Sequence, residues 1–268
     1  MKLSLPLSLQ TVLPDDYESN EGFRSLLDHI HRLGLWGLEL NMSDPRHFDP
    51  IAVRSFLSGF GLELSMVATG LTARRMGLSL SHPDDSVRSK SVEICIHMID
   101  WVAGTDAGII IGFLKGGVAS DPFEARSRFA RSLESILPRA AEKSVAVLVE
   151  ATNRYESSVA NTVGQAAELL SGFPAAFAQV LPDTFHMNIE ESDMGAALRM
   201  ASDRIRSLHL SDNNRLFPGF GAIDFAAVFS LLREIGYTGR LAIEGSIRTS
   251  VEEDLSESLA LIAPMLQV

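Results

Sequence analysis

The chain alternates eight short apolar runs with longer stretches of helical periodicity, and this alternation constrains its fold more than any other feature. Stretches such as Pro122–Lys143 and Phe225–Ile235 carry helix-forming residues between the runs. Strands connected through helices must lie parallel, with right-handed crossovers. The predicted strands are Leu3–Leu9, Leu35–Leu40, Leu62–Val67, Gly108–Ile111, Val145–Val149, Ala178–Leu181, Ile205–Leu210 and Leu241–Ile243.

Eight strand–helix units in 268 residues favour a closed barrel. Such a barrel typically has about 250 residues in one domain. An open doubly wound sheet that binds a dinucleotide has no support, because no Gly-x-Gly-x-x-Gly follows the first run. No low-complexity linker divides the chain. The sequence therefore predicts an α/β fold, a single (β/α)8 TIM barrel over residues 1–268.

Composition excludes several classes of partner. The formal net charge is −11 and no Lys/Arg run is present, so we expect no nucleic acid partner. No apolar stretch reaches the length of about 18 residues that suggests a membrane span, so no membrane partner is expected either. The N-terminal run lacks a small-residue cleavage site and is interpreted as a strand, not a signal peptide. Cys95, the single cysteine, cannot form an intramolecular disulfide, which is typical of a cytoplasmic protein.

Each of the last four predicted strands ends at a side chain that binds metals: Glu150, Asp183, His209 and Glu244. These residues are 33, 26 and 35 positions apart, one strand–helix unit in each step. The C-terminal ends of barrel strands share one face, so the four side chains are expected to converge there. Three converging carboxylates would repel one another without a cation. The alternative, that these acids only cap helices or lie in solvent, does not account for four at unit spacing.

The donor types narrow the choice of metal. Three carboxylates and one imidazole suit Mn²⁺, Mg²⁺ or Co²⁺ better than a structural Zn²⁺, which prefers cysteine. We therefore expect a divalent metal as cofactor, with Mn²⁺ as the first choice and Mg²⁺, Co²⁺ or Zn²⁺ as alternatives.

Three motifs around these positions resemble one enzyme family. They are residues 150–156 (EATNRYE), 183–191 (DTFHMNIEE) and 209–224 (HLSDNNRLFPGFGAID). With Glu244 after the last strand, they are similar to ketose 3-epimerases of the D-tagatose/D-psicose 3-epimerase type, which are xylose-isomerase-like TIM barrels. The resemblance is strong over about residues 140–245 and weaker but collinear before them.

The resemblance implies a role for each matched residue. The metal ligands match Glu150, Asp183, His209 and Glu244, and the groups that hold the substrate match Glu156, His186 and Arg215. It also implies a small sugar as substrate and a homo-oligomer, either dimer or tetramer. Two loops that touch the far end of the sugar differ from the family: residues 245–246 are Gly-Ser instead of Pro-Phe, and residues 112–117 read GFLKGG. The substrate sugar is therefore left open.

The expected reaction is proton transfer on a small ketose, catalysed by Glu150 and Glu244. A C–H beside a carbonyl ionises only if a divalent metal on the neighbouring oxygens stabilises the enediolate. Epimerisation at C3 needs a base on one face and an acid on the other, and these two glutamates come from different strands. An aldose–ketose isomerase would use the same enediolate, and a metal-dependent keto-polyol dehydratase the same ligands. The resemblance favours the epimerase.

Two further functions fit the residues less well. The same barrel family includes a trinuclear-zinc endonuclease, which needs additional histidines after strands three and four and an Asp-x-His after strand seven, all missing here. A non-catalytic sugar-binding barrel would be expected to have lost one of the two glutamates. Among the other histidines, His82 alone lies in a loop that is a candidate for contact with a ligand.

Overall fold

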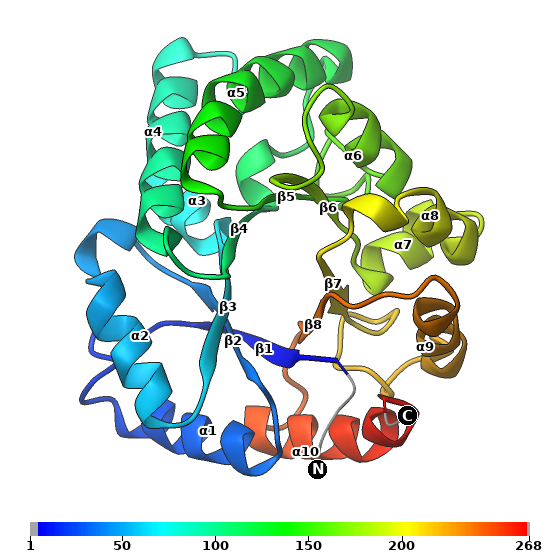
Figure 1. Ribbon diagram of the computed structural model, residues 1–268. Helices are drawn as coiled ribbons and strands as arrows, with labels where there is room; N and C mark the ends of the chain where they lie inside the picture. Colours follow the sequence, from blue (N-terminus) through cyan, green and yellow to red (C-terminus); the bar gives the residue numbers. More distant parts are fainter. Residues whose placement is uncertain (1–4, 267–268) are drawn as a thin grey trace.

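In the computed structural model, which describes residues 5–266, eight parallel strands form a ring and the helices surround it, as predicted (Figure 1). The strand order is β6-β5-β4-β3-β2-β1-β8-β7. Only isolated bridges join β6 to β7, one of them between Asp183 and His209, so the barrel is nearly closed. The strands are β1 Leu7–Val12, β2 Gly37–Asn41, β3 Glu63–Ala68, β4 Gly108–Ile111, β5 Val147–Glu150, β6 Ala178–Leu181, β7 Ser207–Leu210 and β8 Arg240–Ile243.

The first strand begins and ends later than predicted. Its pairing with β2 runs from Ser8, opposite Gly37, to Val12, opposite Asn41, whereas the apolar run ends at Leu9. Gln10 belongs to the strand although it is polar, because it lines the cavity at the barrel mouth and not the apolar surface under the helices. The predicted start at Leu3 lies outside the described residues.

Ten helices are described between and after the strands, and two of the connections hold a pair of them: α3 with α4, and α7 with α8. Aspartates begin several helices; the side chain of Asp121, for example, accepts a hydrogen bond from the backbone N–H of Glu124. The helices are α1 Glu21–Arg32, α2 Pro50–Gly59, α3 Gly70–Met76, α4 Asp85–Val102, α5 Pro122–Lys143, α6 Val163–Leu170, α7 Thr184–Glu190, α8 Met194–Met200, α9 Phe225–Glu234 and α10 Val251–Ile262. Among residues 5–266, no helix combines the length and apolar composition needed to cross a membrane.

The core has two parts, because side chains along a strand alternate between the two faces of the sheet. Outward-facing residues join the large cluster beneath the helices, which also contains Cys95. Burial raises the pKa of the Cys95 thiol, so this side chain packs as a small apolar group. A smaller cluster lies inside the barrel, formed by Met66, Ala68, Ile110, Ala146, Leu148 and Leu181. This inner cluster is the apolar base on which the polar residues of the barrel mouth stand.

Candidate metal centre and active site

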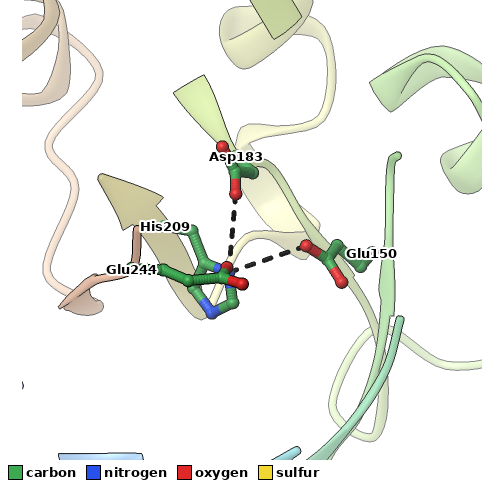
Figure 2. A group of neighbouring side chains, drawn as sticks. All are labelled: Glu150, Asp183, His209 and Glu244. Carbon is green, nitrogen blue, oxygen red and sulfur yellow. Dashed lines mark ion pairs between the residues drawn. The ribbon is translucent and has the colours of Figure 1, made fainter. Parts of the chain in front are cut away.

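The four predicted metal ligands converge at the C-terminal ends of neighbouring strands. Glu150 is the last residue of β5, His209 lies within β7, and Glu244 directly follows β8. Asp183 caps the N-terminus of α7, two residues after β6. Each residue offers one ligand atom within 4.8 Å of those of the others. Figure 2 shows Glu150 reaching the cluster from the side opposite to Glu244 and His209.

The cluster fits a divalent cation in its dimensions and in its chemistry. Nδ1 of His209 lies 2.6 Å from Oε2 of Glu244, 3.6 Å from Oε1 of Glu150 and 3.8 Å from Oδ2 of Asp183. Atoms bound to one cation at about 2.0–2.5 Å are separated by comparable distances. Nδ1 of His209 and Oε2 of Glu244 are buried without a hydrogen-bond partner among residues 5–266, which is costly unless another group satisfies them. A cation bound by these atoms would satisfy both.

Arg215 contacts two of the carboxylates. Its guanidinium nitrogens lie 2.6 Å from Oδ2 of Asp183 and 2.5 Å from Oε1 of Glu244, and the group lies over the ring of Phe185. Burial alone would raise the pKa of Glu244, but the charges of Arg215 and His209 outweigh it and hold that pKa well below its usual range. Glu244 is therefore ionised in this arrangement.

Opposing effects also set the pKa values of His209 and Glu150. Burial lowers the pKa of His209, but the carboxylates of Glu39 and Glu244 raise it well above the ordinary value. Burial would raise the pKa of Glu150, but contact with His209 lowers it below the ordinary value. The shifts in pKa thus favour negative charge on Glu150 and positive charge on the neighbouring His209.

A cavity of about 260 Å³ opens beside the cluster, and the three predicted substrate-holding residues, Glu156, His186 and Arg215, all line it. His186 lies in the first turn of α7, the helix that Asp183 caps. The backbone N–H of Asn153 donates to Nδ1 of His186 at 3.2 Å, so Nε2 is the nitrogen that carries the proton. Nε2 lies 3.8 Å from Oε1 of Glu150.

Sequence reasoning missed two buried charged residues beside the cluster. Glu39, on β2, places Oε1 2.9 Å from Nε2 of His209. Lys115 is fully buried, and its Nζ donates to the backbone oxygen of Glu150 and to Oγ1 of Thr152, both at 2.6 Å. Burial lowers the pKa of Lys115 to about 8. Neither residue had a local signal of burial, because Glu39 lies in an alternating apolar–polar strand and Lys115 in a short turn.

The loop after β4 lies against the cluster and lines the cavity beside it. Gly112, Phe113 and Gly116 line the cavity. A Cβ atom at Gly112 would lie 2.1 Å from Oε2 of Glu150, so the glycine is needed for the carboxylate to take this position. His82, the other candidate, is absent from the cavity lining; its Nδ1 accepts a hydrogen bond from the backbone N–H of Asp84.

Comparison with known proteins places the chain in a family. Residues 27–265 match the xylose isomerase-like TIM barrel family. The chain is 29% identical over 245 residues to the ketose 3-epimerase of Arthrobacter globiformis, covering 90% of this chain and 83% of that one. It is also 29% identical over 228 residues to the L-ribulose 3-epimerase of Mesorhizobium japonicum, covering 84% and 75%. The crystal structure of D-psicose 3-epimerase from Clostridium cellulolyticum H10 has the same fold, with a TM-score of 0.83 at 21% identity, over 98% of this chain and 100% of that one.

The chain belongs to the xylose isomerase-like TIM barrel family. Within it, the resemblance predicted from the motifs is confirmed, since the similar proteins include curated sugar 3-epimerases.

Proposed function

We propose that this protein is a divalent-metal-dependent ketose 3-epimerase. The observation that carries the proposal is the pair Glu150 and Glu244, which approach from opposite sides a cluster that fits a cation (Figure 2). The similar 3-epimerases support the same activity. The cavity of about 260 Å³ suits a small sugar, because drug-sized ligands occupy pockets of about 300–1,000 Å³.

The proposed mechanism gives the two glutamates complementary tasks. A divalent cation held by Glu150, Asp183, His209 and Glu244 would stabilise the negative charge that develops on the ketone and hydroxyl oxygens of the sugar. Glu150 acts as the ionised base and removes the C3 proton from one face. Glu244, which is ionised in the free site, has to take up a proton when the sugar binds and then delivers it to the other face, so turnover ends with Glu150 protonated and Glu244 ionised. In the reverse direction the two residues exchange these tasks.

The remaining polar groups of the cavity hold the sugar in place. His186 presents its Nε2–H beside Glu150, where it can donate to a substrate oxygen. Glu156 accepts a hydrogen bond from the side chain of Asn153 at 2.8 Å and keeps further lone pairs for a sugar hydroxyl. Arg215 already lies against both Asp183 and Glu244, so it can orient the C1–C2 end of the substrate at the cluster.

Mn²⁺ is our first choice of metal, because the oxygen and nitrogen donors suit it, with Mg²⁺, Co²⁺ and Zn²⁺ as alternatives. A cytoplasmic location and assembly as a homodimer or homotetramer stay predictions.

The test is turnover of a panel of free ketoses in D₂O, with Mn²⁺ present. A 3-epimerase places solvent deuterium at C3 of the product and at C3 of substrate re-formed by reversal. Label at C1 or C2 would assign the enzyme instead as an aldose–ketose isomerase, and loss of one water from the sugar would assign it as a keto-polyol dehydratase. Activity should disappear with a chelator and return with Mn²⁺ or Co²⁺; full activity in a metal-free sample would disprove the metal dependence.

A further inference from the structure

Glu39 is a fully buried acid beside the metal cluster, and the proposed mechanism does not use it. It lies on β2 between Leu38 and Leu40, whose side chains belong to the large apolar cluster beneath the helices, the outer core. Alternation along the strand therefore turns Glu39 toward the inside of the barrel. There it reaches His209, which β7 contributes from another part of the barrel wall.

The surroundings of Glu39 supply few partners for its charge. The side-chain amide of Gln10 donates to Oε1 at 2.5 Å, and Nε2 of His209 lies 2.9 Å from the same atom. Oε2 is buried and has no hydrogen-bond partner among the described residues. A buried carboxylate needs a charged or strongly donating partner, because the loss of hydration is severe. The neutral amide of Gln10 does not meet this need alone, so His209 is the principal partner of Glu39.

The two ring nitrogens of His209 thus face different groups. Nδ1 faces the three carboxylates of Glu150, Asp183 and Glu244, at 2.6–3.8 Å. Nε2 faces Glu39 on the opposite side of the imidazole. Neither nitrogen has an aligned hydrogen bond among residues 5–266, so Nδ1 is available to a cation and Nε2 is within reach of the Glu39 carboxylate.

We propose that Glu39 is a positioning residue for the metal centre: it receives the Nε2–H of His209 and so keeps the lone pair of Nδ1 directed at the cation. The inference rests on the proposed metal site and extends it to a residue outside the four ligands. A histidine that binds a metal generally donates its other N–H to a carboxylate, a carbonyl or water, which fixes its tautomer and orientation. Gln10 lines the substrate cavity and holds Glu39 from the other side.

The test is the affinity of the metal-stripped, full-length protein for Mn²⁺, measured by titration calorimetry without any sugar. Loss of such a carboxylate typically weakens metal binding about 10- to 100-fold. We expect Glu39→Ala to weaken Mn²⁺ binding about 100-fold. Glu39→Gln keeps an oxygen acceptor and loses the charge, so we expect it to restore part of the affinity, leaving it about 10-fold weaker than in the wild type.

Leu40→Ala is the matched control, because Leu40 is buried on the outer face of the same strand. It should lower the melting temperature and leave the Mn²⁺ affinity unchanged. Equal losses of affinity in Leu40→Ala and Glu39→Ala would show that Glu39 acts only through the stability of β2, and would overturn the proposal. Unchanged affinity in Glu39→Ala would overturn it too.

A spectroscopic readout follows the Nε2 proton itself. In the protein loaded with diamagnetic Zn²⁺, ¹H–¹⁵N spectra of the imidazoles should show a slowly exchanging Nε2–H of His209. In Glu39→Ala this proton should exchange with water at least about 10-fold faster; in Leu40→Ala it should not. A His209 ring protonated at Nδ1 in the loaded wild type would contradict the proposal.

The outcome is separable from that of the proposed function. Metal affinity and the Nε2 proton are measured without substrate. If the wild type binds Mn²⁺ and epimerises no ketose, the function fails while the affinities still decide the role of Glu39. If it epimerises a ketose and Glu39→Ala binds Mn²⁺ normally, the function stands and this inference falls. A wild type that binds no divalent metal overturns both.

Discussion

The buried lysine beside the metal centre should make the stability of the fold increase with pH above 8. Lys115 forms no salt bridge among the described residues, and its two hydrogen bonds go to neutral oxygens. Burial, partly offset by the charges of Glu150 and Glu156, lowers its pKa from 10.5 to about 8. In the unfolded chain the lysine regains its ordinary pKa of about 10.4. Between these values the unfolded state binds a proton that the folded state does not, so the free energy of unfolding increases with pH.

The size of the effect follows from the two pKa values. A shift of one pKa unit corresponds to about 1.4 kcal/mol, so a lysine with a pKa of about 8 in the fold adds about 3 kcal/mol to the free energy of unfolding between pH 8 and 10.5. Below pH 8 both states carry the proton and the contribution is flat. At pH 7 the free energy of unfolding is therefore lower by about this amount, because the fold buries a charged ammonium group.

The assay is reversible denaturation by urea of the metal-free protein from pH 7.5 to 10.5, for the wild type and for Lys115→Met. Burial also raises the pKa values of Cys95 and Tyr237, and these two groups lower the stability as the pH rises through their unfolded values. Both proteins contain them, so the difference between wild type and variant isolates Lys115. That difference should grow by about 3 kcal/mol in favour of the wild type. A difference that stays constant would show that Lys115 keeps its ordinary pKa, and the reasoning would be refuted.

Four further substitutions test the site. Glu150→Gln and Glu244→Gln should each lower kcat by about 10²- to 10⁴-fold with the far-UV spectrum unchanged, and turnover at the wild-type rate in either would exclude that residue as acid or base. Gly112→Ala places a methyl carbon 2.1 Å from Oε2 of Glu150 and forces the carboxylate to move, so kcat should fall about 100-fold while the melting temperature changes little. Wild-type kinetics in this variant would show that the carboxylate does not need its present position. Arg215→Ala should raise KM and lower kcat, reducing kcat/KM about 10- to 100-fold; a change in KM alone would confine Arg215 to binding.

The four candidate ligands could be predicted from the sequence because each lies where a buried strand reaches the barrel mouth. A run such as Val145–Val149 is apolar on both faces, so the first charged residue after it, Glu150, marks the end of the strand. The same rule located Glu244 after β8 and Asp183 two residues after β6. The motifs around them then assigned the family, which the comparisons confirmed.

This rule did not identify Glu39, because Glu39 lies inside a strand and not at its end. The segment Leu38-Glu39-Leu40-Asn41 alternates apolar with polar residues, a pattern that indicates a strand with one face in solvent. In a closed barrel the second face is the interior, where Glu39 is fully buried and Asn41 lines the cavity. Only the closure of the sheet into a barrel distinguishes a strand face in solvent from a face in the barrel interior. The local sequence pattern is the same in both cases.

The burial of Lys115 also could not be predicted from the sequence, but for a different reason. It lies in a short 3-10 turn, Phe113–Lys115, which is too brief to show a hydrophobic period. Its burial results from the packing of this turn against the end of β5 and the residues that follow, where Thr152 and the backbone of Glu150 accept its protons. A lysine followed by two glycines is usually interpreted as exposed. That interpretation is wrong for Lys115, because a long-range contact decides its burial.

The alternation of the strands explains why charged residues at the mouth can be both rigid and reactive. Two positions before Glu150 the inward-facing residue is Leu148, and two positions before Asp183 it is Leu181; both belong to the inner apolar cluster. The carboxylates therefore lie directly above a buried apolar cluster. Its low local dielectric constant strengthens the electrostatic interactions among them and with a substrate. The outward-facing residues Val149 and Ile243 anchor β5 and β8 in the outer core, which limits how far the glutamates at their ends can move. The proposed proton transfer across C3 would need such fixed supports. The barrel supplies them through the same two-residue period that places the acids at its mouth.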